Sequence, residues 1–361
     1  MKSNFNDNKL INLHHNQIGI WGISYDAWVA LYENLLIPLK NYKIGFYGRK
    51  FECESKTNVL SFNYKNYNLK VNDLFNEFRK GHFFALSDIV LYHGDHSIVD
   101  EMWLILDESE QFKPIINNLK NTTKVFFNEQ NKSIANQLKK ENNHIQLIYS
   151  KQVETIAEHI EAKIKSNIAP LIGLVLTGGD SIRMKENKSL IKYHQQPQWL
   201  HIFEMLKDAC AETFVSCTQN NQYLYLQKQL VIDKITGYGP LSGILTALLG
   251  FKNKAILVVA CDLPLIDKNI IKQLIDERDA SKVATAFYNE ESNQIEPLIT
   301  IYEPKALTVM LQMLALGYRS PQVMLAQNDI KIVKPNNSSA LKNVNFPEEK
   351  EQIMQFLKSQ L

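Results

Sequence analysis

The sequence predicts an α/β protein built from two doubly wound, three-layer α/β/α domains. Short apolar runs of strand length alternate with segments of helical periodicity along the whole chain. Parallel strands need such helical crossovers between them, so this alternation favours parallel sheets covered by helices. The 361 residues also exceed the size at which one hydrophobic core usually stops growing. We therefore expect one domain at 1–168 and a second at 169–361.

The first half shows this alternation in six apolar runs and two amphipathic segments. The Asn- and Lys-rich region 49–80, between the apolar runs 42–48 and 88–94, fits either a small antiparallel excursion or a loop. Trp21, Trp28 and Trp103 are expected in the core. The expected strands are 17–23, 42–48, 88–94, 101–106, 124–128 and 145–149, and the expected helices are 27–39 and 152–164.

The segment "KSNIAP" (165–170) interrupts the pattern with residues that end helices, and a new series begins directly after it. No internal repeat relates the two halves, which indicates two different modules. The expected strands of the second half are 171–179, 212–218, 255–264 and 282–289, with helices near 198–210, 241–251, 268–278 and 303–316.

Composition and charge exclude several classes of function. The 40 basic and 38 acidic residues are interspersed and leave a net charge of +2, so no overall field favours a nucleic acid or a membrane surface. The absence of a leader pattern and of a long apolar stretch predicts a cytoplasmic protein. Cys53, Cys210, Cys217 and Cys261 lack CxxC spacing and are expected as packed, reduced thiols, and the pair His14–His15 as solvated side chains.

The stretch "LVLTGGDSIRMKENKSLI" (174–191) is the first candidate site. An apolar strand ends in Gly178 and Gly179, which bring bare backbone N–H groups to one point, as anion-binding turns do. Arg183 and Lys188 add the positive charge that a polyphosphate requires. The spacing matches neither GxxxxGK[ST] nor GxGxxG, so a structural turn with two solvated cations stays an alternative.

Two further stretches point to the same chemistry. "GYGPLSGILTALL" (237–249) places glycines and a proline before a helix, although a structural turn explains it equally well. In "ILVVACDLPLID" (256–267), Asp262 ends a run apolar enough to be a central strand. Ligands of open α/β sheets bind at the carboxyl ends of strands, and a carboxylate beside a polyphosphate implies Mg²⁺ between them. The alternative is a carboxylate that caps the next turn.

These stretches, in this order, resemble the molybdenum cofactor guanylyltransferases of the MobA type. Family members resemble LxGGxSxRMGxxK, GPLxGI, CDxP and an NVNTPE-like segment, and the corresponding stretches here are "LTGGDSIRMKENK", "GPLSGI", "CDLP" and "NVNFPEE" (343–349). The resemblance covers about residues 170–361 and implies a Rossmann-like nucleotidyltransferase fold in the second domain. The sequence departs from the family at Lys185, where glycine is usual, and at Asn187, often an aspartate.

The resemblance also implies roles for single residues. Arg183, Lys188 and Asp262 would be catalytic, with Asp262 as the magnesium ligand. Asn343 and Asn345 would border the pterin, although an Asn-rich surface turn is the alternative. The nucleotide-binding residues implied are Leu176, Thr177, Gly178, Gly179, Lys188, Asp233, Gly239, Pro240 and Leu241.

The function implied is transfer of GMP from GTP to molybdopterin with release of pyrophosphate. Mg²⁺ is the cofactor, GTP and molybdopterin are the substrates, and molybdoenzymes or their chaperones are further partners. The alternatives are a cytidylyl- or sugar-nucleotidyltransferase of the same fold and a non-catalytic scaffold that binds the molybdenum cofactor.

The first domain resembles a degenerate P-loop module of the MobB-type accessory GTPase. Its turn "GISYDAWVA" (22–30) lacks the Gly-Lys-Ser/Thr that holds the β- and γ-phosphates. We therefore expect an interaction or cofactor-handling role there, without GTP hydrolysis.

Overall fold

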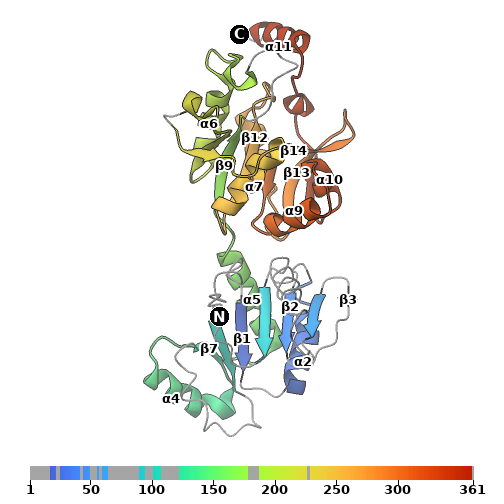
Figure 1. The fold of residues 1–361 in the computed structure, drawn as a ribbon. Helices are drawn as coiled ribbons and strands as arrows, with labels where there is room; N and C mark the ends of the chain where they lie inside the picture. The colour runs from blue at the N-terminus through green and yellow to red at the C-terminus, as the bar shows by residue number, and fades with distance from the viewer. Residues whose placement is uncertain are drawn as a thin grey trace, which may run out of the picture. The chain divides into compact units, whose positions relative to one another are not determined.

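The computed structural model describes residues 17–21, 25–40, 44–48, 55–56, 59–63, 89–93, 101–106, 122–177, 187–225 and 228–359. The chain divides into two compact units, Met1–Ile168 and Ala169–Leu361. Each unit has its own sheet and its own hydrophobic core (Figure 1). The division falls within the "KSNIAP" segment.

The N-terminal unit consists of strands that alternate with helices. Its sheet has the order β3-β4-β2-β5-β1-β6-β7-β8, and the pairs are parallel except for β3 with β4. Its elements are β1 (Gln17–Trp21), α2 (Tyr25–Leu35), β2 (Ile44–Gly48), β3 (Ser55–Lys56), β4 (Val59–Asn63), β5 (Ile89–His93), β6 (Glu101–Ile105), β7 (Thr122–Phe126), η3 (Glu129–Asn131), α4 (Lys132–Glu141), β8 (Gln146–Ile148) and α5 (Val153–Ser166).

Helices cover both faces of this sheet, as alternating side chains of β6 demonstrate. Trp103 and Ile105 pack with the α2 and α5 cluster, which includes Trp28, whereas Leu104 and Leu106 pack with the α4 cluster. The prediction of a doubly wound α/β unit is thus confirmed, and Trp28 and Trp103 are core residues. The side chain of Trp21 and residues His14, His15 and Cys53 lie outside what the structure describes.

The C-terminal unit has the sheet order β11-β10-β9-β12-β14-β13-β15. Its elements are β9 (Leu171–Leu176), η4 (Lys188–Leu190), α6 (Gln198–Ala209), β10 (Thr213–Cys217), η5 (Gln222–Tyr225), β11 (Leu230–Ile232), α7 (Pro240–Gly250), β12 (Ala255–Ala260), α8 (Lys268–Asp276), β13 (Ala284–Asn289), β14 (Gln294–Tyr302), α9 (Ala306–Ala315), α10 (Pro321–Ala326), β15 (Lys331–Val333), η6 (Ser338–Leu341) and α11 (Pro347–Ser359).

The second sheet is mixed, because one of its strands runs antiparallel to its neighbours. β14 runs antiparallel to both β12 and β13, and the turn at 290–293 joins it to β13. Pro297 lies in the irregular stretch of β14, before its pairing with β12 begins at Ile299. A proline removes one ladder donor, so this irregular position is where it is tolerated. The hairpin carries the chain across the sheet without a crossover helix.

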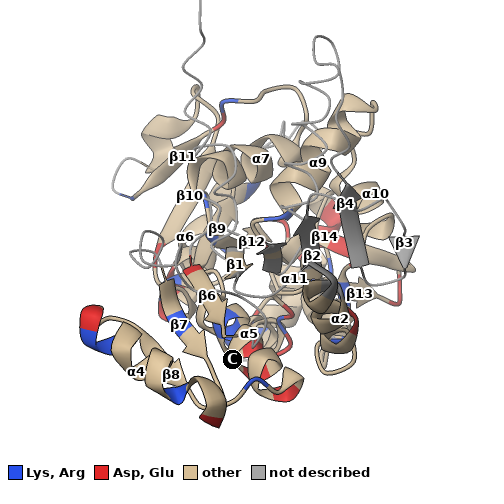
Figure 2. Cartoon of the chain, turned by 90° about the horizontal axis from the view of Figure 1, so that it is seen from below, with Lys and Arg blue, Asp and Glu red and all other residues tan. Residues whose placement is uncertain are grey.

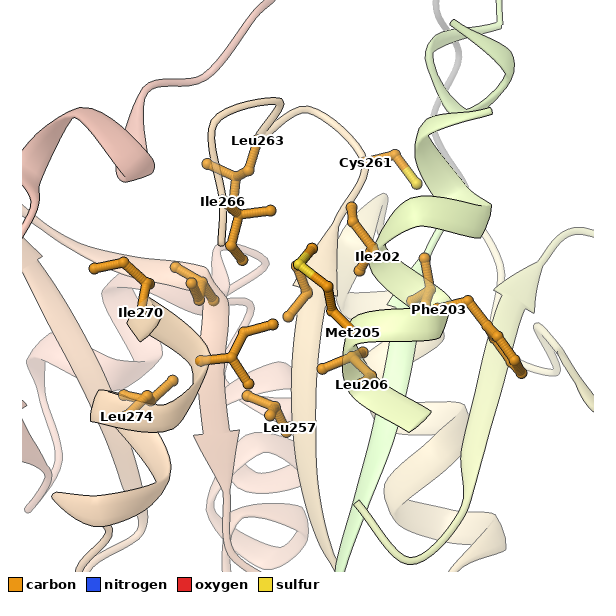
Figure 3. Close-up of a cluster of buried hydrophobic side chains, with 14 of the residues drawn as sticks. Ile202, Phe203, Met205, Leu206, Leu257, Cys261, Leu263, Ile266, Ile270 and Leu274 are labelled. Carbon is orange, nitrogen blue, oxygen red and sulfur yellow. The ribbon is translucent and has the colours of Figure 1, made fainter. Parts of the chain in front are cut away.

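The core of this unit lies between the sheet and two of its helices. Leu257 of β12 packs against residues of α6 and α8, among them Leu206 and Leu274, and Leu263 and Ile266 close the top of the cluster (Figure 3). Helices α7 and α9 contact each other on the opposite face, where α7 also contacts β9, β10 and β12. This unit is therefore three-layered and doubly wound as well.

The distribution of charged residues and the burial of the described cysteines agree with what the composition predicts. Lys, Arg, Asp and Glu are interspersed along the chain (Figure 2). Cys217 and Cys261 are buried and Cys210 is half-buried, and burial raises the pKa of Cys210 to about 12 and that of Cys217 to about 11. Thiols with such pKa values are poor nucleophiles and poor ligands. No helix in the described ranges is long and apolar enough to cross a membrane.

Candidate functional site

The carboxyl ends of β9, β10 and β12 form the base of the candidate site. β9 lies between the other two in parallel register, with Leu176 opposite both Ser216 and Ala260. Directly after β9, Thr177 Oγ1 donates to the backbone oxygen of Ser216 at 2.7 Å. The side chain of Leu176 is buried, so this residue offers a ligand only its backbone.

The N-terminus of α7 lies over this edge because of its two motif glycines. Gly239 precedes the helix with φ of +55°, a conformation that side-chain-bearing residues rarely adopt, and Pro240 opens the first turn. A Cβ on Gly243 would lie 2.3 Å from Ser216 Oγ and 2.9 Å from Leu176 Cδ2. Glycine at this position therefore lets α7 approach the ends of β9 and β10.

The first turn of α7 carries the positive end of the helix dipole, which favours an anion in front of it. Pro240 has no N–H, and the N–H of Ser242 donates to Gly239 O at 3.0 Å. Leu241 is fully buried, so its side chain belongs to the core. Ser242 contributes locally, since its Oγ accepts a hydrogen bond from the N–H of Tyr238 at 3.2 Å.

Asp233 follows β11 at the same edge of the sheet. Its Oδ1 accepts a hydrogen bond from Ser216 Oγ at 3.0 Å, and its N–H donates to Cys217 O. Burial raises the pKa of the Asp233 carboxyl, and the Ser216 hydroxyl opposes this shift. The carboxylate is thus fixed beside the strand ends, where a ligand could donate to its second oxygen.

Asp262 lies just beyond β12, as the strand-end pattern predicts. Its backbone oxygen accepts from the N–H of Val344 at 2.9 Å, whereas its Oδ1 is buried and has no hydrogen-bond partner among the described residues. Burial raises the pKa of this carboxyl, and the Lys188 ammonium opposes the shift. An orphaned buried carboxylate oxygen needs an external partner, and a hard divalent cation is a fitting one.

Lys188 joins the first motif to the last. Its Nζ donates to Asn345 Oδ1 at 2.6 Å, across 157 positions of sequence. Asn187 begins the short helix η4, where its Oδ1 accepts from the backbone N–H and the hydroxyl of Ser189. Asparagine thus performs the capping that an aspartate would perform at this position.

Helix α11 holds the asparagine segment in place. Val344 packs with Ile191 and with Ile353 of α11. Glu349 Oε2 accepts from the N–H groups of Asn345 and Phe346 at 2.7 and 3.1 Å. These contacts bring the C-terminal motif against Asp262 and Lys188. Asn343 contributes a buried Oδ1 that has no hydrogen-bond partner among the described residues.

Gly178, Gly179, Arg183 and Lys185 fall within 178–186, outside the described residues, so their roles stay predictions. Sequence reasoning also missed a buried carboxylate near the site, Glu296 of β14. Burial raises the pKa of this carboxyl, and the charge of Asp262 adds to the shift. The available signal was a glutamate within the otherwise apolar run "IEPLITI" (295–301). In the part of the chain that is described, no three His, Cys, Asp or Glu side chains form a metal-binding group.

Fold and site together define a nucleotide-binding α/β protein, and comparisons with known proteins specify the family. The family model "MobA-like NTP transferase domain" matches residues 173–331. A "Molybdenum cofactor biosynthesis bifunctional protein" of Synechocystis sp. is 34% identical over 200 residues, which are 55% of this chain and 58% of that protein. The chain thus spans little more than half the length of this relative.

A "Probable molybdenum cofactor guanylyltransferase" of Carboxydothermus hydrogenoformans is 30% identical over 187 residues, 50% of this chain and 93% of that protein. Among solved structures, "Molybdopterin-guanine dinucleotide biosynthesis protein A" from Archaeoglobus fulgidus is 19% identical, with a TM-score of 0.45 and coverage of 52% of this chain and 99% of that one. The chain belongs to the family of MobA-like nucleotidyltransferases.

Proposed function

We propose that the C-terminal unit transfers GMP from GTP to molybdopterin and releases pyrophosphate. The observation that carries this proposal is the orphaned Oδ1 of Asp262, which lies at the carboxyl end of β12 in a family-matched domain. The C-terminal motif supports it, since Val344 contacts the Asp262 backbone and Asn345 accepts from Lys188.

Mg²⁺ fits this site because a carboxylate oxygen is a hard ligand, and no donor in the described part of the chain satisfies the buried Oδ1 of Asp262. Asp262 would hold the ion. When bound there, the metal would supply positive charge to the phosphates of the nucleotide.

Residues of the chain bind and position the nucleotide. Lys188 brings a cation against the phosphates, and its hydrogen bond to Asn345 fixes where that charge lies. The positive end of the α7 dipole and the backbone after β9 bind phosphate or base. Asp233 accepts from donors of the nucleotide through the oxygen that Ser216 leaves available.

In the reaction, a terminal phosphate oxygen of molybdopterin attacks the α-phosphorus of GTP, and the bond to the β-phosphate oxygen breaks. The attacking phosphate is already an anion at neutral pH, so no strong general base is required. Catalysis then rests on alignment and on neutralising charge, which are the main contributions to such transfers.

The test is identification of the product. Purified full-length protein with Mg²⁺, GTP and molybdopterin should yield a species heavier than molybdopterin by one bound GMP, detected by mass spectrometry, and an equal amount of pyrophosphate. Pyrophosphate without the adduct, or neither product, would contradict the proposal. The second outcome would favour a cofactor-binding scaffold.

A further inference from the structure

A cavity of about 430 Å³ adjoins the site on the side of Asn343. It is lined by the β13–β14 hairpin, by the segment 341–343 and by Gln322, whereas Thr177, Lys188 and Asp233 do not line it. Its volume lies within the usual range for pockets that hold small ligands, roughly 300–1,000 Å³. None of these three described residues of the proposed nucleotide site lines the cavity, which is large enough for a fused heterocycle.

Glu296 lies in this cavity and is only 7% exposed. Its Oε1 accepts from Asn289 Nδ2 at 2.8 Å. Among the described residues, its Oε2 has no hydrogen-bond donor and no Lys or Arg forms an ion pair with it. Burying a carboxylate without a cation is unfavourable, so Glu296 in this cavity favours a ligand that presents hydrogen-bond donors to it.

The chemistry of the lining indicates what that partner presents. The free oxygen of Glu296 is an acceptor, and Oε1 keeps a second lone pair after its bond with Asn289. Asn343, whose Oδ1 is buried and has no hydrogen-bond partner among the described residues, lines the same cavity. A ligand that satisfies the carboxylate of Glu296 must present N–H donors.

We propose that Glu296 selects the acceptor substrate by binding the donor edge of a pterin, namely its 2-amino group and the neighbouring N3–H. This inference rests on the proposed function, because it assigns the cavity to the pterin end of molybdopterin. A carboxylate matches that edge with two parallel N–H···O bonds, as it matches a guanidinium group. Glu296 is therefore a specificity-determining residue, distinct from the metal ligand Asp262.

Recognition of the pterin donor edge can be tested by equilibrium binding of two fluorescent ligands, without catalysis. 6-Hydroxymethylpterin carries the 2-amino group, whereas 6-hydroxymethyl-lumazine has a carbonyl oxygen there, which would oppose the carboxylate. We expect the full-length protein to bind the pterin at least about tenfold more tightly than the lumazine in an equilibrium fluorescence titration. Equal affinities, or no binding of either compound, would overturn the inference without any variant.

Glu296→Gln then tests the residue itself. It should remove the preference for the pterin, since the amide offers N–H groups to an edge that needs acceptors. The matched control is Glu291→Gln, which removes an exposed carboxylate at the rim of the same cavity and should keep the preference. A preference that survives in Glu296→Gln would contradict the assignment.

Two measurements distinguish a pterin-binding role of Glu296 from the proposed function alone and from a metal-binding role. If wild type forms the GMP adduct but binds pterin and lumazine equally, the proposed function stands and the role of Glu296 falls. If Glu296→Gln instead raises the Mg²⁺ concentration needed for half-maximal rate, Glu296 is a metal ligand and the pterin assignment is wrong.

Discussion

Two carboxylates of the segment "CDLPLID" (261–267) illustrate how position decides the role of a residue. Asp262 has an orphaned oxygen at the strand end, whereas Asp267 accepts from the N–H of Ile270 at 2.9 Å and caps α8. The Oδ1 of Asp262 has no hydrogen-bond partner among the described residues, whereas Asp267 stabilises a helix. Their substitutions should therefore affect different properties of the protein.

Asp262→Asn should reduce the rate of GMP transfer by at least about 10²-fold, because a neutral amide is a poor ligand for Mg²⁺. The free energy of unfolding should not fall, since the substitution removes a buried charge. Asp267→Ala is the control and should lower the unfolding free energy by about 1 kcal/mol through loss of the N-cap, with transfer retained. Steady-state rates and chemical denaturation measure both, and a transfer rate for Asp262→Asn near wild type would remove Asp262 from the mechanism.

The sequence could identify residues whose role follows from local pattern. Asp262 was predicted because an apolar run ended in it, and Lys188 because it follows a Gly-Gly turn. The partners of these residues, Val344 and Asn345, became adjacent to them only through the packing of α11, which local pattern cannot express. Glu296 was missed for the same reason, since burial of a strand glutamate depends on the neighbouring elements.

At the scale of elements, α7 contains two glycines whose substitution by alanine should have different effects on stability. Gly243→Ala should lower the free energy of unfolding by about 1–3 kcal/mol, because the new Cβ would lie 2.3 Å from Ser216 Oγ and force α7 away from the strands. Transfer should fall as well, since Ser216 holds Asp233. Thermal unfolding and activity measurements test this pair of effects.

Gly250→Ala, at the end of the same helix, is the matched control. No atom lies within 4 Å of a Cβ at that position, so alanine should leave stability unchanged or raise it by up to about 1 kcal/mol. Equal destabilisation by both substitutions would mean that the effect of Gly243 is not the close contact with Ser216.

Helix α6 introduces a pH dependence through His201. Its ring stacks on His194 with 3.9 Å between centroids, and burial, together with His194, lowers the pKa of His201 to about 4. The unfolded chain binds the proton near pH 6.5. Between these two values the unfolded state holds more protons, so this contribution to stability is complete above pH 6.5 and decreases as the pH falls toward 4.

His201→Gln should therefore reduce the loss of Tm between pH 6.5 and pH 4, relative to wild type, while the two proteins differ by a constant amount above pH 7. The measurement is a series of thermal unfolding curves across this range. Parallel Tm profiles for the two proteins would show that His201 titrates normally in the folded state.

Elements with strong periodicity were predictable, and those specified by tertiary contacts were not. The apolar run of β12 and the amphipathic pattern of α8 identify both elements directly. β14 was not predicted because Pro297 interrupts its run and because its partners β12 and β13 are recognisable only after folding. Local sequence pattern therefore could not predict the antiparallel β13–β14 hairpin, although the alternation of strands and helices predicted the α/β class.

At the scale of the whole molecule, the two units carry separate cores and should separate in function. A fragment of residues 169–361 should fold cooperatively and retain GMP transfer, because the C-terminal core and all four motifs lie within it. A fragment of residues 1–168 should neither bind nor hydrolyse GTP, because its turn lacks the lysine and hydroxyl of a working P-loop. Equilibrium GTP binding and phosphate release test both fragments, and hydrolysis by the first would show that its turn retains P-loop function.

Selection of the nucleotide is the most direct test of GMP transfer from GTP. From the sequence, we expect glycine at both positions of the "LTGG" turn to leave room for a purine edge. Backbone N–H and C=O groups could then bind the mixed donors and acceptors of guanine. The wrong base would leave buried polar groups unpaired, which discriminates by orders of magnitude.

The measurement is the initial rate of pyrophosphate release by the full-length protein with Mg²⁺ and molybdopterin, with GTP, CTP or ATP as the nucleotide. We expect the rate with GTP to be at least about 10²-fold higher than with either other nucleotide, and to disappear when molybdopterin is omitted. A preference for CTP would contradict the guanine assignment, and equal rates without molybdopterin would contradict transfer itself.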